Sequence, residues 1–255
     1  MRHQPVQCAA QRLRWMHDQL LAAYGPQHWW PASTPFEVIV GAYLTQNTAW
    51  TSVERSLARL REAGVLNVEG LRTIAEGTLQ ELIRPSGFAT RKAPALKAFV
   101  GLLDEEFGGS LFSMAAAQTE TLRKKLLDLP GVGPETADAI LLYALEHPTP
   151  MADEYLRRIA ERHGLLLPLP GRNRTGYTAL VQLTKDAFAG DPSSHHRQLY
   201  NEFHALTVAV GKTHCGRTAD CTGCPLAGDA HVPLGRTRKG REKETRIKKV
   251  AITRK

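Results

Sequence analysis

Residues 129–138 read Leu-Pro-Gly-Val-Gly-Pro-Glu-Thr-Ala-Asp, and an apolar run that extends to about Leu145 follows them. Two glycines around one valine allow a tight turn, and the helix formers after them predict a helix that begins at the turn. The first N–H groups of that helix have no partner within it, and the helix dipole adds positive charge there, so the turn favours a bound anion such as phosphate. A plain turn between two packed helices has the same pattern, and the motif alone leaves both interpretations open.

A carboxylate lies further along the chain. Asp153 follows the breaker Pro148-Thr149-Pro150 and precedes a helix that we expect to end at Gly164. By itself, an Asp after a proline-rich turn is typical of an N-cap, whose side chain accepts a hydrogen bond from the next helix. Glu135 and Asp138 also have a simple interpretation, as acidic surface residues in the first turns of the hairpin helix, where they suit its dipole.

Leu129-Pro-Gly-Val-Gly133, the helix behind it and Asp153 together resemble the helix-hairpin-helix (HhH-GPD) DNA glycosylases of the endonuclease III family. Leu44-Thr45-Gln46-Asn47-Thr48 is similar to that family's helix end facing the flipped base, and Arg84-Pro85-Ser86-Gly87-Phe88 with Lys92-Ala93 is similar to its second turn-helix unit. The similarity covers most of residues 29–226, in order. It implies a DNA glycosylase in which Asp153 is the catalytic carboxylate.

The spacing of apolar residues predicts an all-α protein, because no stretch alternates long enough to indicate a strand. The resemblance implies two helical subdomains with a cleft between them. We assign residues 35–148 to a helical barrel subdomain that contains the helix-hairpin-helix. Residues 1–34 plus 149–234 are assigned to a second helical subdomain with a Cys loop, and residues 235–255 to a basic tail that we expect to be disordered.

Two turns are the expected contacts to DNA phosphate. The resemblance implies that the hairpin uses Gly131, Val132 and Gly133, and that the second unit uses Gly87 and Lys92. For Lys92 and the arginines around it, a solvated turn is an equally good explanation.

Tryptophans flank the segment that resembles the base-facing helix end: Trp29-Trp30-Pro31 precedes it and Trp50 follows it. Tryptophan is usually a core residue, but its ring also stacks on bases and attracts cations. The Trp-Trp-Pro sequence and the later aromatic resemble the branch of the family that removes 3-methyladenine and related alkylated purines. The resemblance implies that Trp50 and either Trp29 or Trp30 sandwich the base, with Gln46 and Glu135 as further substrate contacts.

The hairpin also bears on the reaction. Bifunctional members of the family carry a Lys two residues after the second hairpin glycine, and its amine forms a Schiff base that leads to strand cleavage. Here that position is Glu135, and a carboxylate cannot form an imine. The expected chemistry is therefore monofunctional hydrolysis, in which Asp153 stabilises the developing oxocarbenium charge and helps orient or deprotonate water.

Cys215, Cys221 and Cys224 are clustered, and Pro225 and His231 follow them. In an intracellular chain such a cluster suggests a metal site rather than disulfides. Related enzymes often carry a four-cysteine loop that holds a [4Fe-4S] cluster, but here the first spacing is one residue short and Ala230 occupies the fourth position. The alternatives are a [4Fe-4S] cluster whose fourth ligand is not a local Cys but His231, Asp229 or Cys8, a decayed loop without metal, and a Cys3His zinc site.

The formal net charge of +8 comes from the tail, where ten Lys and Arg residues stand against Glu242 and Glu244. The tail either attracts nucleic-acid phosphate or is a solvated end that aids solubility. No apolar stretch is long enough for a membrane span, and the N-terminal residues lack the apolar core of a signal peptide. We therefore expect a cytoplasmic, nucleoid-associated monomer that acts on double-stranded DNA.

The function predicted from the sequence is a monofunctional DNA N-glycosylase of base excision repair that flips and removes an alkylated purine such as 3-methyladenine. One alternative is a glycosylase for mismatched or oxidised pyrimidines, as in endonuclease III. A second alternative is a non-catalytic protein that binds DNA lesions, although a pure binder does not require Asp153.

Overall fold

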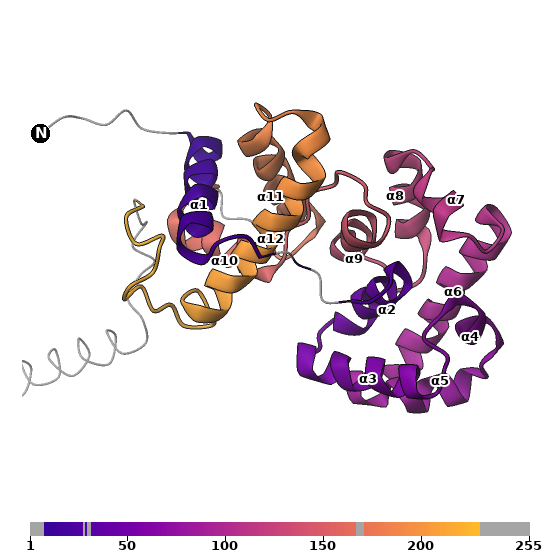
Figure 1. Ribbon diagram of the computed structural model, residues 1–255. Helices are drawn as coiled ribbons and strands as arrows, with labels where there is room; N and C mark the ends of the chain where they lie inside the picture. The colour runs from indigo at the N-terminus through magenta and orange to yellow at the C-terminus, as the bar shows by residue number, and fades with distance from the viewer. Residues whose placement is uncertain (1–7, 28, 30–31, 167–170, 230–255) are drawn as a thin grey trace, which may run out of the picture.

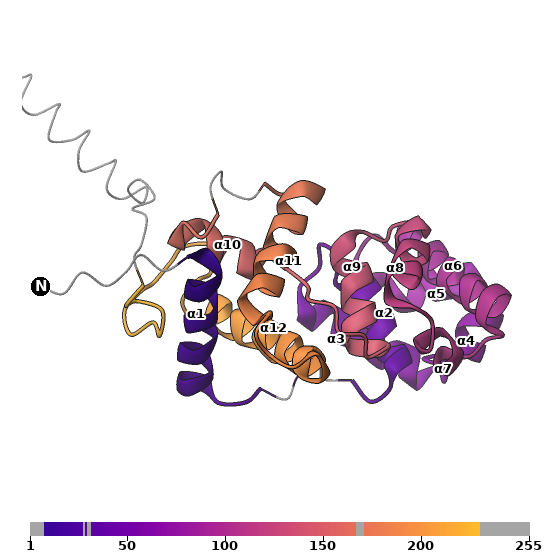
Figure 2. The same ribbon diagram turned by 90° about the horizontal axis from the view of Figure 1, so that it is seen from above.

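The structure, a computed structural model, describes residues 8–27, 29, 32–166 and 171–229. Within these ranges the chain is all-α, with helices joined by loops and no strand. Figures 1 and 2 show two groups of helices side by side, α2 to α9 in one and α1, α10, α11 and α12 in the other. The division of the chain into two subdomains stays a prediction, and residues 235–255 lie outside the described part of the chain. None of the described helices combines the length and apolar composition needed to cross a membrane.

The first group is built around α2 (Pro35–Thr45), in which every residue from Phe36 to Leu44 is buried. A helix that is buried on all sides depends on the helices that cover it. The chain passes from α9 directly into the π-helical segment η2, without an intervening loop. The elements around α2 are α3 (Trp50–Glu62), α4 (Val68–Thr73), α5 (Glu76–Ile83), η1 (Arg84–Ser86), α6 (Ala89–Phe107), α7 (Leu111–Ala115), α8 (Thr119–Asp128), α9 (Pro134–Ala139) and η2 (Ile140–Ala144).

The second group packs α1 against α11 and α12, and α10 against α12. It also touches the first group, because α12 contacts η2 and α11 contacts α9. The two groups therefore meet around the hairpin helix and the segment that follows it. The elements of the second group are α1 (Ala9–Tyr24), α10 (Glu154–His163), α11 (Arg174–Phe188), the short η3 (Ser193–His195) and α12 (His196–Thr213).

Polar caps set the beginnings of the helices that carry the site. Thr34 accepts a 3.1 Å hydrogen bond from the Glu37 N–H group, with Pro35 at the first helical position. Asn173 caps α11 in the same way, accepting from Gly176 at 2.9 Å. These local signals are readable in the sequence, and they fix where α2 and α11 start.

Candidate active site

Asp153 stands at the N-terminus of α10, where its side chain caps the helix. Its Oδ1 atom accepts a 2.9 Å hydrogen bond from the Leu156 N–H group, and the side chain is only 11% exposed. The backbone of Asp153 is extended, with φ −104° and ψ −177°. The sequence-based N-cap interpretation is therefore confirmed, and the carboxylate has one oxygen fixed by the backbone of its own helix.

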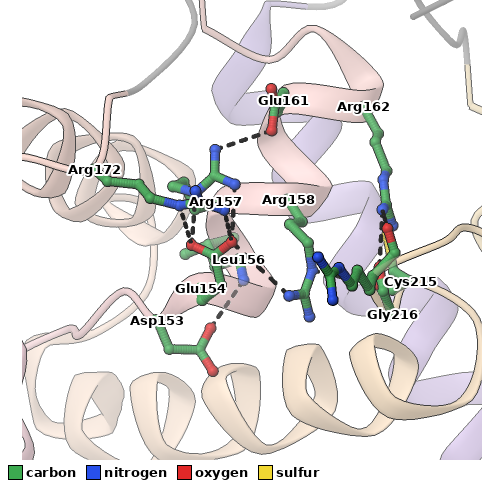
Figure 3. Close-up of polar contacts among 11 residues, drawn as sticks. Asp153, Glu154, Leu156, Arg157, Arg158, Glu161, Arg162, Arg172, Cys215 and Gly216 are labelled. Atoms are coloured by element: carbon green, nitrogen blue, oxygen red, sulfur yellow. Dashed lines mark hydrogen bonds and ion pairs between the residues drawn. The ribbon is translucent and has the colours of Figure 1, made fainter. Parts of the chain in front are cut away.

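A group of ion pairs holds the first turns of α10, next to Asp153 (Figure 3). Glu154 accepts from Arg157 at 2.7 and 2.9 Å and from Arg172 at 2.8 Å, and Arg157 also donates to Glu161 at 2.9 Å. The hydrogen bonds from Arg157, followed by those from Arg172, lower the pKa of Glu154 to about 2. Glu154 is therefore a fixed anion that anchors α10 and not a proton donor.

The second oxygen of Asp153 faces α12, and the carboxylate points toward that helix in Figure 3. Its Oδ2 atom lies 3.5 Å from Nε2 of His204. The other ring nitrogen of the buried His204, Nδ1, is hydrogen-bonded to the hydroxyl of Tyr143 on η2. Trp29 stacks on the His204 ring, with centroids 5.2 Å apart and planes at 30°. Asp153 therefore lies where both groups of helices meet.

The glycine-rich turn between α8 and α9 has the backbone that its sequence predicts. Gly131 has a φ of +75°, in the left-handed region that side-chain-bearing residues rarely adopt. Val132 is buried and donates its N–H group to the Leu129 carbonyl at 3.2 Å. Pro134 is the first residue of α9. The turn is thereby anchored to the core while Gly131 remains at the surface.

Glu135 follows in the first turn of α9, and its side chain is open to water. Neighbouring protein nevertheless removes part of the hydration of the carboxyl group, and this loss raises the pKa of Glu135 to about 7. The negative charges of Asp153 and then Glu154 add to the same effect. The charge of Asp153, which comes from the other group of helices, therefore acts on the carboxyl group of Glu135.

Gln46 joins the end of α2 to the hairpin. Its Nε2 atom donates to the Gly131 carbonyl and to the Thr136 hydroxyl, both at 3.0 Å. Gln46 is one of the predicted substrate contacts, and the structure places it directly against the hairpin turn. A base contact from Gln46 stays a prediction.

Lys92 has a different role from the predicted phosphate contact. Its ammonium group is buried and donates to the Leu44 carbonyl at 2.8 Å, to the Thr48 hydroxyl at 2.8 Å and to the Ser86 carbonyl at 2.9 Å. These bonds use all three N–H groups of the lysine. Lys92 therefore ties the end of α2 to the second turn, and we withdraw it as a phosphate ligand; Gly87, with a φ of +68°, remains exposed in that turn.

Comparison with known proteins assigns the chain to a family. Residues 40–179 match the HhH-GPD superfamily of base excision DNA repair proteins. This protein belongs to the HhH-GPD superfamily. It is therefore a DNA glycosylase of base excision repair.

Relatives and solved structures agree with this membership. A candidate DNA repair glycosylase of Methanocaldococcus jannaschii is 38% identical over 209 residues, which cover 81% of this chain and 90% of the relative. The structure of Helicobacter pylori 3-methyladenine DNA glycosylase (MagIII) bound to 1,N6-ethenoadenine has a TM-score of 0.68 and 28% identity, covering 81% of this chain and 98% of that one. A non-covalent endonuclease III–DNA complex shares the fold, with a TM-score of 0.68 at 20% identity over 92% and 98% of the two chains.

Two of the three predicted aromatic contacts of this HhH-GPD protein, Trp29 and Trp50, lie within the described residues. Trp29 contacts His204 and, with centroids 6.4 Å apart, the edge of Tyr143. Trp50 begins α3, and its indole N–H group donates to Glu54 at 2.9 Å. Trp30 lies outside the described residues. A base sandwiched between Trp50 and one of the two earlier tryptophans stays a prediction.

The cysteine segment does not offer the donor set of a four-thiolate cluster. Cys215 is buried with its sulfur 2.9 Å from Nη1 of Arg162, Cys221 is exposed, and Cys224 is partly buried. Asp229, one of the alternative fourth ligands, is instead bonded to Arg12 at 2.9 Å and to His163 at 2.8 Å. The described residues contain no group of three or more His, Cys, Asp or Glu that could hold a metal.

The other alternative ligands lie apart from this arrangement. Cys8 is exposed at the N-cap of α1. His231 lies outside the described part of the chain. No step of the reaction is assigned to a metal or cluster.

Two polar groups of the site were not expected from the sequence. Asp138, for which a surface position was the simple interpretation, is completely buried; it accepts from Arg123 at 2.6 and 2.9 Å and from the Tyr177 hydroxyl at 2.7 Å. This network links the hairpin to α11. His204 was also missed, because a single histidine within the apolar face of α12 is indistinguishable from an ordinary core residue in the sequence.

Proposed function

We propose that this glycosylase removes alkylated purines such as 3-methyladenine from duplex DNA by hydrolysis, without cutting the strand. The observation that carries the proposal is the placement of Glu135. It occupies the hairpin position at which the bifunctional enzymes that the sequence resembles carry a lysine, and its pKa responds to Asp153. A carboxyl group there cannot form the imine that precedes strand cleavage.

Asp153 supplies the charge that hydrolysis needs. Loss of the base leaves positive charge on the sugar, and an ionised carboxylate at close range stabilises it. The Leu156 N–H group fixes one carboxylate oxygen, and the lone pairs that no protein group uses face the sugar or orient water. Flipping the nucleotide into the site costs a few kcal/mol, less when the base pair is already damaged.

The groups near Asp153 suit a cationic base. N-alkylation gives a purine positive charge, which an aromatic face and nearby carboxylates both attract. Trp29 stacks on His204, which faces Asp153, and Glu135 lies in the first turn of α9. The H. pylori relative, whose structure contains a modified adenine, supports a purine substrate.

The hairpin is the proposed contact to the DNA backbone. Gly131 and Gly133 carry no side chain at the surface of the turn, so phosphate can approach the N–H groups at the start of α9. Lys92 joins the turn of Ser86 and Gly87 to the end of α2, and Gln46, next to that end, is bonded to the hairpin turn at Gly131. We expect the duplex to lie across these two turns.

Base release from three duplexes tests the proposal, one containing 3-methyladenine, one uracil and one thymine glycol. Wild type and Asp153→Asn are compared, and half of each sample is treated with alkali, which cleaves abasic sites that the enzyme leaves intact. We expect alkali-dependent cleavage at the alkylated purine, lost in the variant. Release of a pyrimidine instead would support the endonuclease III-type alternative, and binding without release would support the lesion-binding alternative.

A further inference from the structure

Asp153 has a neighbour on α12 that the reaction as described does not use. His204 is only 5% exposed, and a buried imidazole needs partners for its polar atoms. Its two ring nitrogens face two different elements: Nδ1 bonds to the Tyr143 hydroxyl on η2, and Nε2 lies 3.5 Å from Oδ2 of Asp153. The histidine thus connects α12 with both segments that form the site.

The hydrogen-bonding capacities of these groups fix the tautomer. An ionised Asp153 only accepts, so a favourable contact requires a proton on Nε2 of His204. In the neutral ring Nδ1 is then an acceptor, and the Tyr143 O–H group is the donor that it faces. Burial, followed by the charges of Asp153 and Glu202, raises the pKa of Tyr143 well above its usual value, so the hydroxyl keeps its proton.

We propose that His204 is a positioning residue that holds the Oδ2 side of Asp153, and that Tyr143 holds His204 in the required tautomer. The proposal rests on the proposed role of Asp153 as the catalytic carboxylate. With Leu156 on Oδ1 and His204 facing Oδ2, the carboxylate plane is fixed by two separate helices. The lone pairs that remain then face the sugar in a single orientation, which is the geometric requirement for a large rate effect.

Trp29 extends this arrangement to the base pocket. It stacks on His204 at 5.2 Å and lies edge-on to Tyr143 at 6.4 Å. A base that stacks on Trp29 would thus contact the residue that packs on His204, the histidine that faces Asp153. Other charged groups lie nearby: Glu202 on α12 accepts from the Gln27 N–H group at 2.5 Å, and Glu135 on α9 has a pKa that the charge of Asp153 helps to raise.

The test compares His204→Leu, which removes the donor, with His204→Gln, which returns an N–H donor near Nε2. The matched control is His163→Gln, because His163 is also a buried histidine bonded to a carboxylate, Asp229, but lies at the far end of α10. Single-turnover base release is measured on the substrate that the wild type cleaves, with thermal unfolding alongside. We expect His204→Leu to slow release about 100-fold, His204→Gln to recover most of that loss, and His163→Gln to release base at the wild-type rate.

Rescue by His204→Gln separates positioning from a merely structural role. A lost N–H donor is restored by a different polar side chain that carries one, whereas lost packing is not. A folded His204→Leu variant with the wild-type rate overturns the proposal. So does a uniform loss of rate that His204→Gln does not restore.

A measurement without substrate keeps the proposal testable if the assigned reaction is wrong. Nitrogen NMR of histidine-labelled protein reports which ring nitrogen of His204 carries the proton. We expect the Nε2–H tautomer in the wild type and a perturbed Nε2 signal in Asp153→Asn. An Nδ1–H tautomer overturns the proposal whatever the substrate, whereas failure of all base release with the expected tautomer overturns only the proposed reaction.

Discussion

The Oδ1 atom of Asp153 accepts a 2.9 Å hydrogen bond from the backbone of Leu156, so the candidate catalytic carboxylate is also the cap of α10. Asn caps helices as well as Asp does, whereas Ala does not. We expect Asp153→Asn to keep the free energy of unfolding within about 0.5 kcal/mol of wild type, and Asp153→Ala to lose about 1 kcal/mol. Both should abolish base release. Chemical unfolding and single-turnover assays check this, and an active Asn variant would remove Asp153 from the chemistry.

Glu135→Lys places an amine at the hairpin position that bifunctional relatives use. If this position reaches the sugar, the amine should form a Schiff base with it, and borohydride should then trap a covalent protein–DNA adduct. Glu135→Gln is the control, since it removes the charge without adding an amine and should give no adduct. Base release by Glu135→Lys without any trapped adduct would show that the hairpin side chain does not reach the sugar.

The raised pKa of Glu135 predicts a pH dependence of stability. Between about pH 4.5, its usual pKa, and about pH 7, the folded protein holds a proton on Glu135 that the unfolded chain has released. Stability from this group therefore falls as pH rises through that window. In urea unfolding, the stability of Glu135→Gln relative to that of the wild type should increase from about pH 5 to about pH 8. Glu120→Gln, an exposed residue in the first turn of α8, is the control, and equal slopes for wild type and Glu135→Gln would contradict the prediction.

The buried Asp138 network should be important for stability. Asp138→Ala leaves Arg123 and Tyr177 without their shared acceptor and should cost about 3 kcal/mol of unfolding free energy. Tyr177→Phe removes a single hydrogen bond to a charged group and should cost about 1.5 kcal/mol. Asp128→Ala, at an exposed position on the end of α8, should change stability by less than about 0.5 kcal/mol. Losses no larger than that of the control would mean that the network is not stabilising.

Iron analysis tests the cysteine segment. Because Asp229 is bonded to Arg12 and His163 and only three cysteines are clustered, we expect protein purified without oxygen to lack the iron, sulfide and visible absorbance of a [4Fe-4S] cluster. His231→Ala should leave the metal content unchanged. Iron and sulfide in cluster stoichiometry that are lost in Cys215→Ser would contradict this expectation and point to a fourth ligand from elsewhere.

The helices and the hairpin are predictable because their signals are local. Thr34-Pro35 marks the start of α2, and the glycine pair around Val132 marks the turn before α9. The substitution of Glu135 for lysine is likewise visible in the sequence, since it depends on position within a motif. Caps, turns and periodicity involve residues a few positions apart, which a single sequence displays directly.

The hydrogen-bond partners of the buried polar side chains were not predictable, because these partners lie far away in the sequence. Lys92 was expected at phosphate because exposed basic residues often flank DNA-binding turns, but its three acceptors come from two other segments. Asp138 was expected at the surface because acidic residues suit a first helical turn, but α8 and α11 enclose it. Such contacts depend on how helices that are distant in the sequence pack together. The spacing of apolar residues within one helix does not reveal that packing.

The hydrogen bonds of Lys92 and Gln46 affect how much the protein and the duplex each deform on binding. Lys92 joins residues 44–48 to the turn at Ser86, and Gln46 joins the same residues to the hairpin at Gly131. These bonds hold the two DNA-binding turns in fixed positions in the free protein. Binding therefore costs the protein little conformational entropy. The duplex is then the more deformable of the two molecules. The DNA, and not the protein, therefore bends when a nucleotide leaves the stack. Lesions that already weaken the stack would be selected by their mechanical compliance, before any contact with the altered base.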